Sequence, residues 1–265
     1  MKELICEMCG SNNVIKQDGL FVCQSCNTKY SIEEAKKIMF GETVEVTGTV
    51  KIDHSSELDN LYKLARRARD NNNMDDAYQY YKEILLKDPN NWEPQFYTAY
   101  YKATKTSIGN ISLAAKELAN TIATVFNMVK GSITDENEIS KILIEITSKV
   151  VPLGTVLFNA AKRHYDGINS RIKDKFVQEY VSRGSNVVDL LYNLGNMIIE
   201  VFGEKYSDLS VTAWKAGVSV HTVVFDNYAK KDYHAKLIFE YCDKISKYDS
   251  SFERPKLKKG LFGHY

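Results

Sequence analysis

The residues best suited to chemistry lie in the first thirty positions, where four cysteines form two Cys-x-x-Cys pairs. Cys6 and Cys9 make the first pair, Cys23 and Cys26 make the second, and thirteen residues separate the pairs. Two thiolates three positions apart can hold one tetrahedral ion from a tight turn, and a second such turn completes a shell of four sulfurs. The spacing predicts one structural Zn²⁺ ion. A disulfide or a redox pair is the alternative, but a redox Cys-x-x-Cys needs neither a second copy nor this spacing.

A short β-hairpin is predicted between the two cysteine pairs. Residues 14–17 and 20–23 flank Asp18-Gly19, a dipeptide that readily takes the positive φ angles of a two-residue turn. With Cys-Glu-Met-Cys-Gly at residues 6–10, Cys-Gln-Ser-Cys-Asn at residues 23–27 and Tyr30, the segment resembles a zinc ribbon of the transcription factor IIB type. Asn27 stands where that ribbon usually has glycine, and asparagine is the next best residue for a left-handed backbone.

The resemblance implies contact with nucleic acid or a polymerase, and the charge of the segment bears on that implication. Residues 1–40 contain five lysines and five acidic residues, to which four thiolates and one dication add a formal charge of minus two. The zinc-loaded segment is therefore net negative, whereas binding to a phosphate backbone requires positive charge. We expect a ribbon that contacts protein or is purely structural, with direct nucleic-acid binding as the alternative.

Most of the remaining chain has the apolar period of helices, so the expected fold class is mainly α. Ser31 and Glu34 form a capping box that opens a short helix, and amphipathic stripes follow at residues 111–129, 139–150 and 187–201. Pro152 is predicted to begin or kink a helix that continues toward residue 180, and Gly-Ser-Asn at residues 184–186 is predicted to interrupt the helical pattern. A further helix is predicted over 209–228, although the valines at residues 218–224 also allow a strand there. The expected divisions are a zinc ribbon with a short helix at 1–40, an extended connector at 41–56, a helical hairpin region at 57–108, a helical bundle at 109–249 and a basic aromatic tail at 250–265.

The hairpin region resembles a tetratricopeptide repeat. Leu64 and Ala65 stand at the packing positions of its first helix, Ala77 and Tyr81 at those of the second, and Pro89 closes the unit. A second copy beginning near residue 92 is partial, and three repeats are usually needed for a free-standing solenoid. The resemblance implies a peptide-binding surface, for which a tyrosine-rich groove is the candidate because tyrosine offers large contact area at small entropic cost. The candidate residues are Tyr80, Tyr97 and Tyr101.

Two groups of basic residues are further candidates for binding a partner. Arg66 and Arg67 lie on the first helix of the hairpin region, where exposed cations either form a solvated face or bind an anion or acidic partner. Lys256, Lys258 and Lys259 lie in the tail among apolar and aromatic residues. Such a tail is either flexible or packed on its own domain, or it docks to a partner, an anionic surface or RNA.

Composition limits the remaining possibilities. The chain has 35 basic and 34 acidic side chains, so its overall charge favours no class of partner. Cys242 has no mate, which indicates a reducing compartment, and the N-terminus lacks a signal-peptide core. No run approaches the roughly 20 apolar residues of a membrane span. We therefore expect a cytoplasmic adaptor or scaffold that binds protein or peptide, with a nucleic-acid or transcription-associated factor and an enzyme with an undetected site as alternatives.

Overall fold

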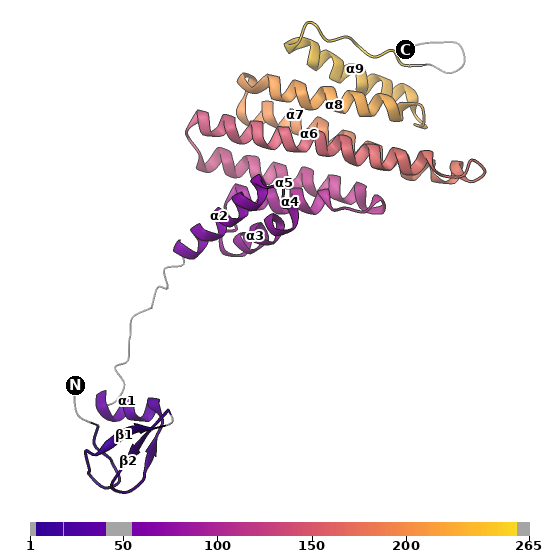
Figure 1. Ribbon diagram of the computed structural model, residues 1–265. Helices are drawn as coiled ribbons and strands as arrows, with labels where there is room; N and C mark the ends of the chain where they lie inside the picture. The colour runs from indigo at the N-terminus through magenta and orange to yellow at the C-terminus, as the bar shows by residue number, and fades with distance from the viewer. Residues whose placement is uncertain (1–3, 18, 41–54, 259–265) are drawn as a thin grey trace. The chain divides into compact units, whose positions relative to one another are not determined.

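The computed structural model describes residues 4–17, 19–40 and 55–258, which belong to two units, Met1–Asp53 and His54–Tyr265 (Figure 1). The chain is 74% helical, with nine helices after a small three-stranded sheet among these described residues. The expectation of a mainly α fold that begins with a small β module is therefore confirmed. The predicted connector at 41–56 lies outside the described residues except for its last two positions, which belong to a helix.

The first unit contains a three-stranded antiparallel sheet and one helix. Strands β1 (Val14–Gln17), β2 (Leu20–Cys23) and β3 (Lys29–Tyr30) lie in the order β1-β2-β3, and helix α1 (Ile32–Phe40) packs against β2 and β3. Gln17 pairs with Leu20, which leaves a two-residue turn, and Gly19 in that turn has a φ of 83°. The capping box is present: the Ser31 N–H donates to Glu34 Oε2 at 2.8 Å, and the Glu34 N–H donates to Ser31 Oγ at 3.2 Å. Local sequence signals thus define this unit.

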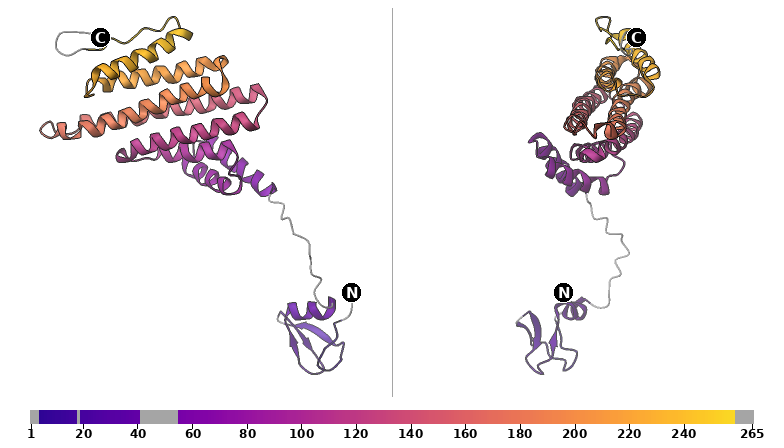
Figure 2. Two further views of the ribbon diagram at one scale, coloured as in Figure 1. Left: turned by 180° about the vertical axis from the view of Figure 1, so that it is seen from behind. Right: turned by 90° about the vertical axis from the view of Figure 1, so that its right-hand side faces the viewer.

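The secondary-structure elements in the described part of the second unit are all helices. Its eight α-helices form four successive antiparallel pairs, visible as stacked layers in Figures 1 and 2. The pairs are α2 (Ser55–Asp70) with α3 (Met74–Lys87), α4 (Trp92–Thr104) with α5 (Ile111–Ser132), α6 (Glu136–Asp166) with α7 (Val177–Phe202), and α8 (Ser207–Phe225) with α9 (Lys231–Tyr248). One hydrophobic core extends from Leu61 to Leu257, so the expected hairpin region and bundle share a single interior.

Two boundaries differ from the expectations. Pro152 lies inside the single helix α6, and the chain leaves that helix after Asp166 rather than continuing toward residue 180. The predicted break at residues 184–186 is wrong, because α7 continues through Gly184. A Cβ atom at Gly184 would lie 2.6 Å from Val224 Cγ2, so this glycine permits close packing of α7 on α8. Residues 218–224 belong to α8, which excludes the strand that their valines allowed.

Helix α6 is long and apolar enough to cross a membrane by length and composition, contrary to the expectation from apolar runs. Half of its apolar window is buried inside the structure, and the helix packs against α7 and α8. This burial is typical of a core helix, which meets the same length and composition criteria.

Candidate metal centre

The sulfur atoms of the two cysteine pairs converge on one site. The Sγ atoms of Cys6, Cys9, Cys23 and Cys26 all lie within 4.8 Å of one another. Cys6 Sγ lies 3.6 Å from Cys26 Sγ, and Cys9 Sγ lies 3.6 Å from Cys23 Sγ. Zinc–sulfur bonds of about 2.3 Å in a tetrahedron place neighbouring sulfurs about 3.8 Å apart. The four sulfurs therefore fit a single tetrahedral ion.

Two similar backbone turns position the sulfurs. The Gly10 N–H donates to the Cys6 carbonyl and the Asn27 N–H donates to the Cys23 carbonyl, both at 2.8 Å. Gly10 has a φ of 71° and Asn27 a φ of 59°, so each turn ends in the left-handed conformation. This confirms that asparagine takes the place of glycine in the second turn, because its short polar side chain tolerates that conformation. The hairpin register then brings the two turns side by side.

Hydroxyl groups supplement the sulfur cluster. The Tyr30 hydroxyl lies 3.0 Å from Cys6 Sγ and accepts the Glu7 N–H at 3.1 Å, and Thr28 Oγ1 lies 3.1 Å from Cys26 Sγ. The hydrogen bond with Tyr30 lowers the pKa of the Cys6 thiol to about 6. Since hydrogen bonds that stabilise a thiolate also stabilise it as a ligand, Tyr30 supports metal binding at Cys6.

The cluster is asymmetric in its exposure. Cys6 and Cys23 are fully buried, whereas Cys9 and Cys26 are exposed. A backbone hydrogen bond with Ser11 lowers the pKa of the Cys9 thiol, but hydrogen bonds with the neighbouring cysteine sulfurs, Cys26 first, outweigh it and raise that pKa to about 12. Metal binding must therefore release protons, and its affinity must rise with pH. Four sulfur ligands close the coordination shell, which is typical of a structural site.

The predicted tyrosine groove is not an open surface. Tyr97 and Tyr101 are 0% and 4% exposed, and only Tyr80 of the three candidates is half-buried. The rings of Tyr81 and Tyr97 stack with centroids 4.6 Å apart, and Tyr97 and Tyr101 stack at 5.8 Å. Tyr97 and Tyr101 are therefore core residues, because residues four positions apart on α4 share a face and both rings stack against Tyr81 of α3.

A buried carboxylate, which the sequence analysis missed, binds one of the candidate arginines. Glu93 is 5% exposed, and its Oε2 accepts the Arg66 Nη2–H at 2.6 Å while its Oε1 accepts the Tyr81 hydroxyl at 2.8 Å. Arg69 Nη1 lies 3.5 Å from Glu93 and 3.2 Å from Glu145 of α6. Arg66 thus stabilises the helical unit, whereas Arg67 is exposed and has no ion pair among the described residues. The sequence signal for Glu93 was its place beside Pro94 in the first turn of α4, where a carboxylate interacts favourably with the helix dipole.

The tail is packed on the helical unit as far as residue 258. Leu257 is 1% exposed, Arg254 forms an ion pair with Asp243, and Phe252 packs partly against the core. Lys256 and Lys258 remain exposed, and Lys259 lies outside the described residues. The tail therefore adopts the packed alternative in its described part while leaving two candidate cations accessible.

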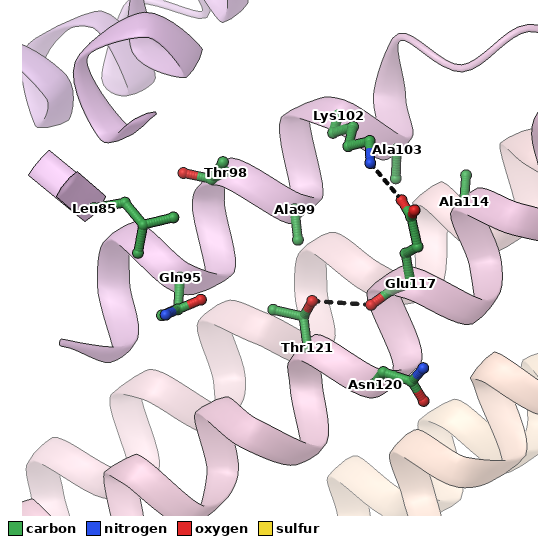
Figure 3. A pocket seen from close by; sticks show the side chains of 10 residues that line it. All are labelled: Leu85, Gln95, Thr98, Ala99, Lys102, Ala103, Ala114, Glu117, Asn120 and Thr121. Atoms are coloured by element: carbon green, nitrogen blue, oxygen red, sulfur yellow. Dashed lines mark hydrogen bonds and ion pairs between the residues drawn. The ribbon is translucent and has the colours of Figure 1, made fainter. Parts of the chain in front are cut away.

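A pocket of about 360 Å³ lies among α3, α4 and α5 (Figure 3). Lys102 of α4 and Glu117 of α5 form an ion pair across it at 2.7 Å, so the two charges of its lining neutralise each other. Thr98 Oγ1 is buried and has no hydrogen-bond partner among the described residues. The lining is otherwise formed by small, amide, hydroxyl and leucine side chains, which offer neither a nucleophilic thiol nor an imidazole.

No protein-family model, curated protein or solved structure matches this chain. The class of protein is therefore defined by its own features: a possible metal-binding cluster of four cysteines beside a β-hairpin, followed by a helical unit.

Proposed function

We propose that this protein is a zinc-binding intracellular adaptor whose metal-folded ribbon and helical unit bind other macromolecules and which has no catalytic activity of its own. The observation that carries the proposal is the convergence of four cysteine sulfurs within 4.8 Å. Zinc favours an all-thiolate tetrahedron, and such sites fold small segments that cannot bury a sufficient core. In this proposal the ribbon is of the transcription factor IIB type and the protein is cytoplasmic.

The surface of the ribbon supports a protein partner. Five large apolar side chains of this small unit are between 37% and 75% exposed, namely Ile5, Met8, Ile15, Leu20 and Ile32. Ile5 directly precedes the first cysteine turn and Met8 lies within it, so the proposed metal ion would hold both in place. Exposed apolar side chains at this density are typical of protein contacts, whereas a nucleic-acid surface requires cations. Metal binding and partner binding are therefore coupled in the ribbon.

The α2–α3 pair supports a tetratricopeptide-like role for the start of the helical unit. Ala65, Ala77 and Tyr81, which hold the repeat's packing positions, are all 0% exposed. Leu64 departs from that pattern because it is 42% exposed, and Leu86 of α3 is 80% exposed. These two side chains, with Tyr80 and Arg67, are the accessible candidates for peptide contact on this pair.

The metal is tested first. Protein purified under reducing conditions should contain one zinc per chain by plasma mass spectrometry, and Cys23→Ser should lose it while Cys242→Ser, which changes a core thiol of α9, retains it. Zinc at a stoichiometry near zero in the unchanged chain, or equal retention by both variants, contradicts the proposal.

The partner is tested by comparing variants in affinity capture with quantitative mass spectrometry. A protein that binds the chain should be lost with Met8→Asp and with Cys23→Ser but retained by Leu113→Asp, which places the same charge on an exposed site of α5. If every captured protein is retained equally by Met8→Asp and Leu113→Asp, the ribbon is not the contact surface.

The second candidate function is a nucleic-acid or transcription-associated factor that uses the ribbon and the tail. It is favoured by the exposure of Lys256 and Lys258 on either side of buried Leu257. Replacing both lysines with glutamine should then weaken salt-dependent retention on nucleic acid. Unchanged retention by that variant removes the tail from consideration.

A further inference from the structure

Positive charge is concentrated at the end of the α6–α7 pair, in a segment that we name the basic tip, residues 162–175. It holds five cations and two carboxylates, a formal charge of plus three in a chain whose total is plus one. The rest of the chain is therefore slightly negative. The cations are Lys162, Arg163, Arg171, Lys173 and Lys175, and the acids are Asp166 and Asp174.

The fold projects this segment outward and fixes it. Helices α6 and α7 have 31 and 26 residues, and their joined end extends past the neighbouring helical pairs (Figures 1 and 2). Lys173 Nζ lies 3.7 Å from Asp166 Oδ1 and 4.6 Å from the centroid of the Tyr165 ring, so it joins the two sides of the tip. Tyr165 stacks on Tyr180 of α7 at 4.5 Å. The tip is thus preorganised, which lowers the entropic cost of binding.

Three cations of the tip are free to bind a ligand. Arg163, Arg171 and Lys175 are exposed, and no ion pair joins them to other described residues. Asp166 is already used by Lys162 at 2.5 Å and by Lys173. The dipole of α6 accounts for a cation in its last turn, such as Arg163, but not for Arg171 and Lys175, which follow the end of that helix. Two of the three therefore have no role in stabilising α6.

We propose that the basic tip binds the phosphate backbone of nucleic acid without reading base sequence. Guanidinium groups donate paired hydrogen bonds to phosphate, and each neutralised phosphate releases a counterion. This site is independent of the adaptor function proposed above, because it lies in the helical unit and requires no metal.

An anionic membrane is a weaker fit to the tip. Ile172, at 44% exposed, is the only large apolar side chain of the tip that is strongly exposed among the described residues. Stable membrane attachment combines a polybasic patch with a substantial apolar insertion, which one isoleucine does not supply. Phosphate contact through exposed arginine and lysine matches the tip more closely.

The test is fluorescence anisotropy of the zinc-loaded full chain with a labelled 20-base-pair DNA duplex. Three phosphate contacts give a salt exponent of about −2.7, so affinity should fall about 40-fold between 50 and 200 mM NaCl. The triple variant Arg163→Gln, Arg171→Gln, Lys175→Gln should bind at least about 20-fold more weakly at 50 mM and lose most of that salt dependence. The control Lys63→Gln, Lys82→Gln, Lys116→Gln removes the same charge from exposed sites of α2, α3 and α5 and should bind like the unchanged chain.

A second measurement needs no variant. Duplex DNA should slow acetylation of Lys175 in the unchanged chain, read by mass spectrometry, while acetylation of Lys116 proceeds at the same rate. The proposal is overturned if the duplex does not bind at 50 mM NaCl, if the two triple variants bind equally, or if Lys175 is not protected. It is also overturned if vesicles with 30% phosphatidylserine, and not the duplex, retain the chain through the tip.

Discussion

The pair of histidines between α8 and α9 should make the stability of the helical unit depend on pH. His221 is 1% exposed, its Nδ1 lies 3.3 Å from the Tyr192 hydroxyl, and its Nε2 lies 3.1 Å from Nδ1 of His234. Burial, and secondarily the positive charge that His234 can carry, lower the pKa of His221 from 6.5 to about 3. The folded protein therefore holds a neutral imidazole across the physiological range.

The sign and size of the effect follow from proton linkage. Below pH 6.5 the unfolded chain takes up a proton at His221 and the folded chain does not, so the free energy of unfolding must fall as pH falls from 6.5 toward 3. Each pKa unit corresponds to about 1.36 kcal/mol, so His221 should remove about 2 kcal/mol between pH 7 and pH 5. This is a large part of the stability of a typical domain.

Urea unfolding followed by helical circular dichroism at pH 7, 6 and 5 measures this dependence. His221→Gln should flatten the curve by about 2 kcal/mol relative to the unchanged chain, whatever its stability at pH 7. His164→Gln, which changes an exposed histidine of α6, should leave the curve unchanged. The reasoning fails if His221→Gln keeps the full pH dependence or if His164→Gln loses as much of it.

Three further substitutions test packing, charge and the metal site. Gly195→Ala should destabilise the chain by about 1 to 3 kcal/mol because its methyl group would overlap Trp214, whereas Gly131→Ala in open space should stabilise α5 by about 0.5 kcal/mol; urea midpoints that move together would contradict this. Glu93→Gln should cost about 1 to 2 kcal/mol in unfolding free energy because it weakens the charge-assisted hydrogen bonds of Arg66, which is 53% exposed, while Arg69 keeps Glu145 and Asp70; exposed Glu83→Gln should stay within about 0.5 kcal/mol. Tyr30→Phe should weaken zinc affinity at least about 10-fold in competition with a chromophoric chelator, and Tyr233→Phe should have no effect.

The cluster of four cysteines could be predicted from sequence because its determinants are local. A cysteine pair, a left-handed residue and a two-residue turn each fix a few neighbouring φ and ψ angles, and the register of one hairpin then brings the sulfurs together. Asn27 is an example, since the left-handed backbone conformation expected for this asparagine is the one observed. The mainly α fold was predictable for a similar reason, because the helical spacing of apolar residues in the sequence does not depend on which elements the helix packs against.

The tyrosines and charges of the helical unit could not be placed in the same way. A run such as Tyr97, Tyr100 and Tyr101 fits either a core or a surface, and only the docking of α4 on its neighbours decides which rings are buried. Glu93 likewise requires Arg66 and Arg69 from another helix before burial becomes tolerable. The basic tip was missed because the end of α6 at Asp166 depends on packing, and Pro152 and Gly184 gave misleading boundaries.

The two units differ in what stabilises them, and this separates the two proposed activities. The described core of the first unit is formed by Cys6, Cys23, Tyr30 and Ala35, which is too little apolar surface to fold a chain without metal. The core of the helical unit extends from Leu61 to Leu257 and contains no metal cluster among its described residues. In the proposed function, removal of zinc releases Ile5 and Met8 from their positions and leaves the α6–α7 tip intact. Under the proposals made above, metal availability controls the protein contact of the ribbon and leaves the nucleic-acid contact of the helices unchanged.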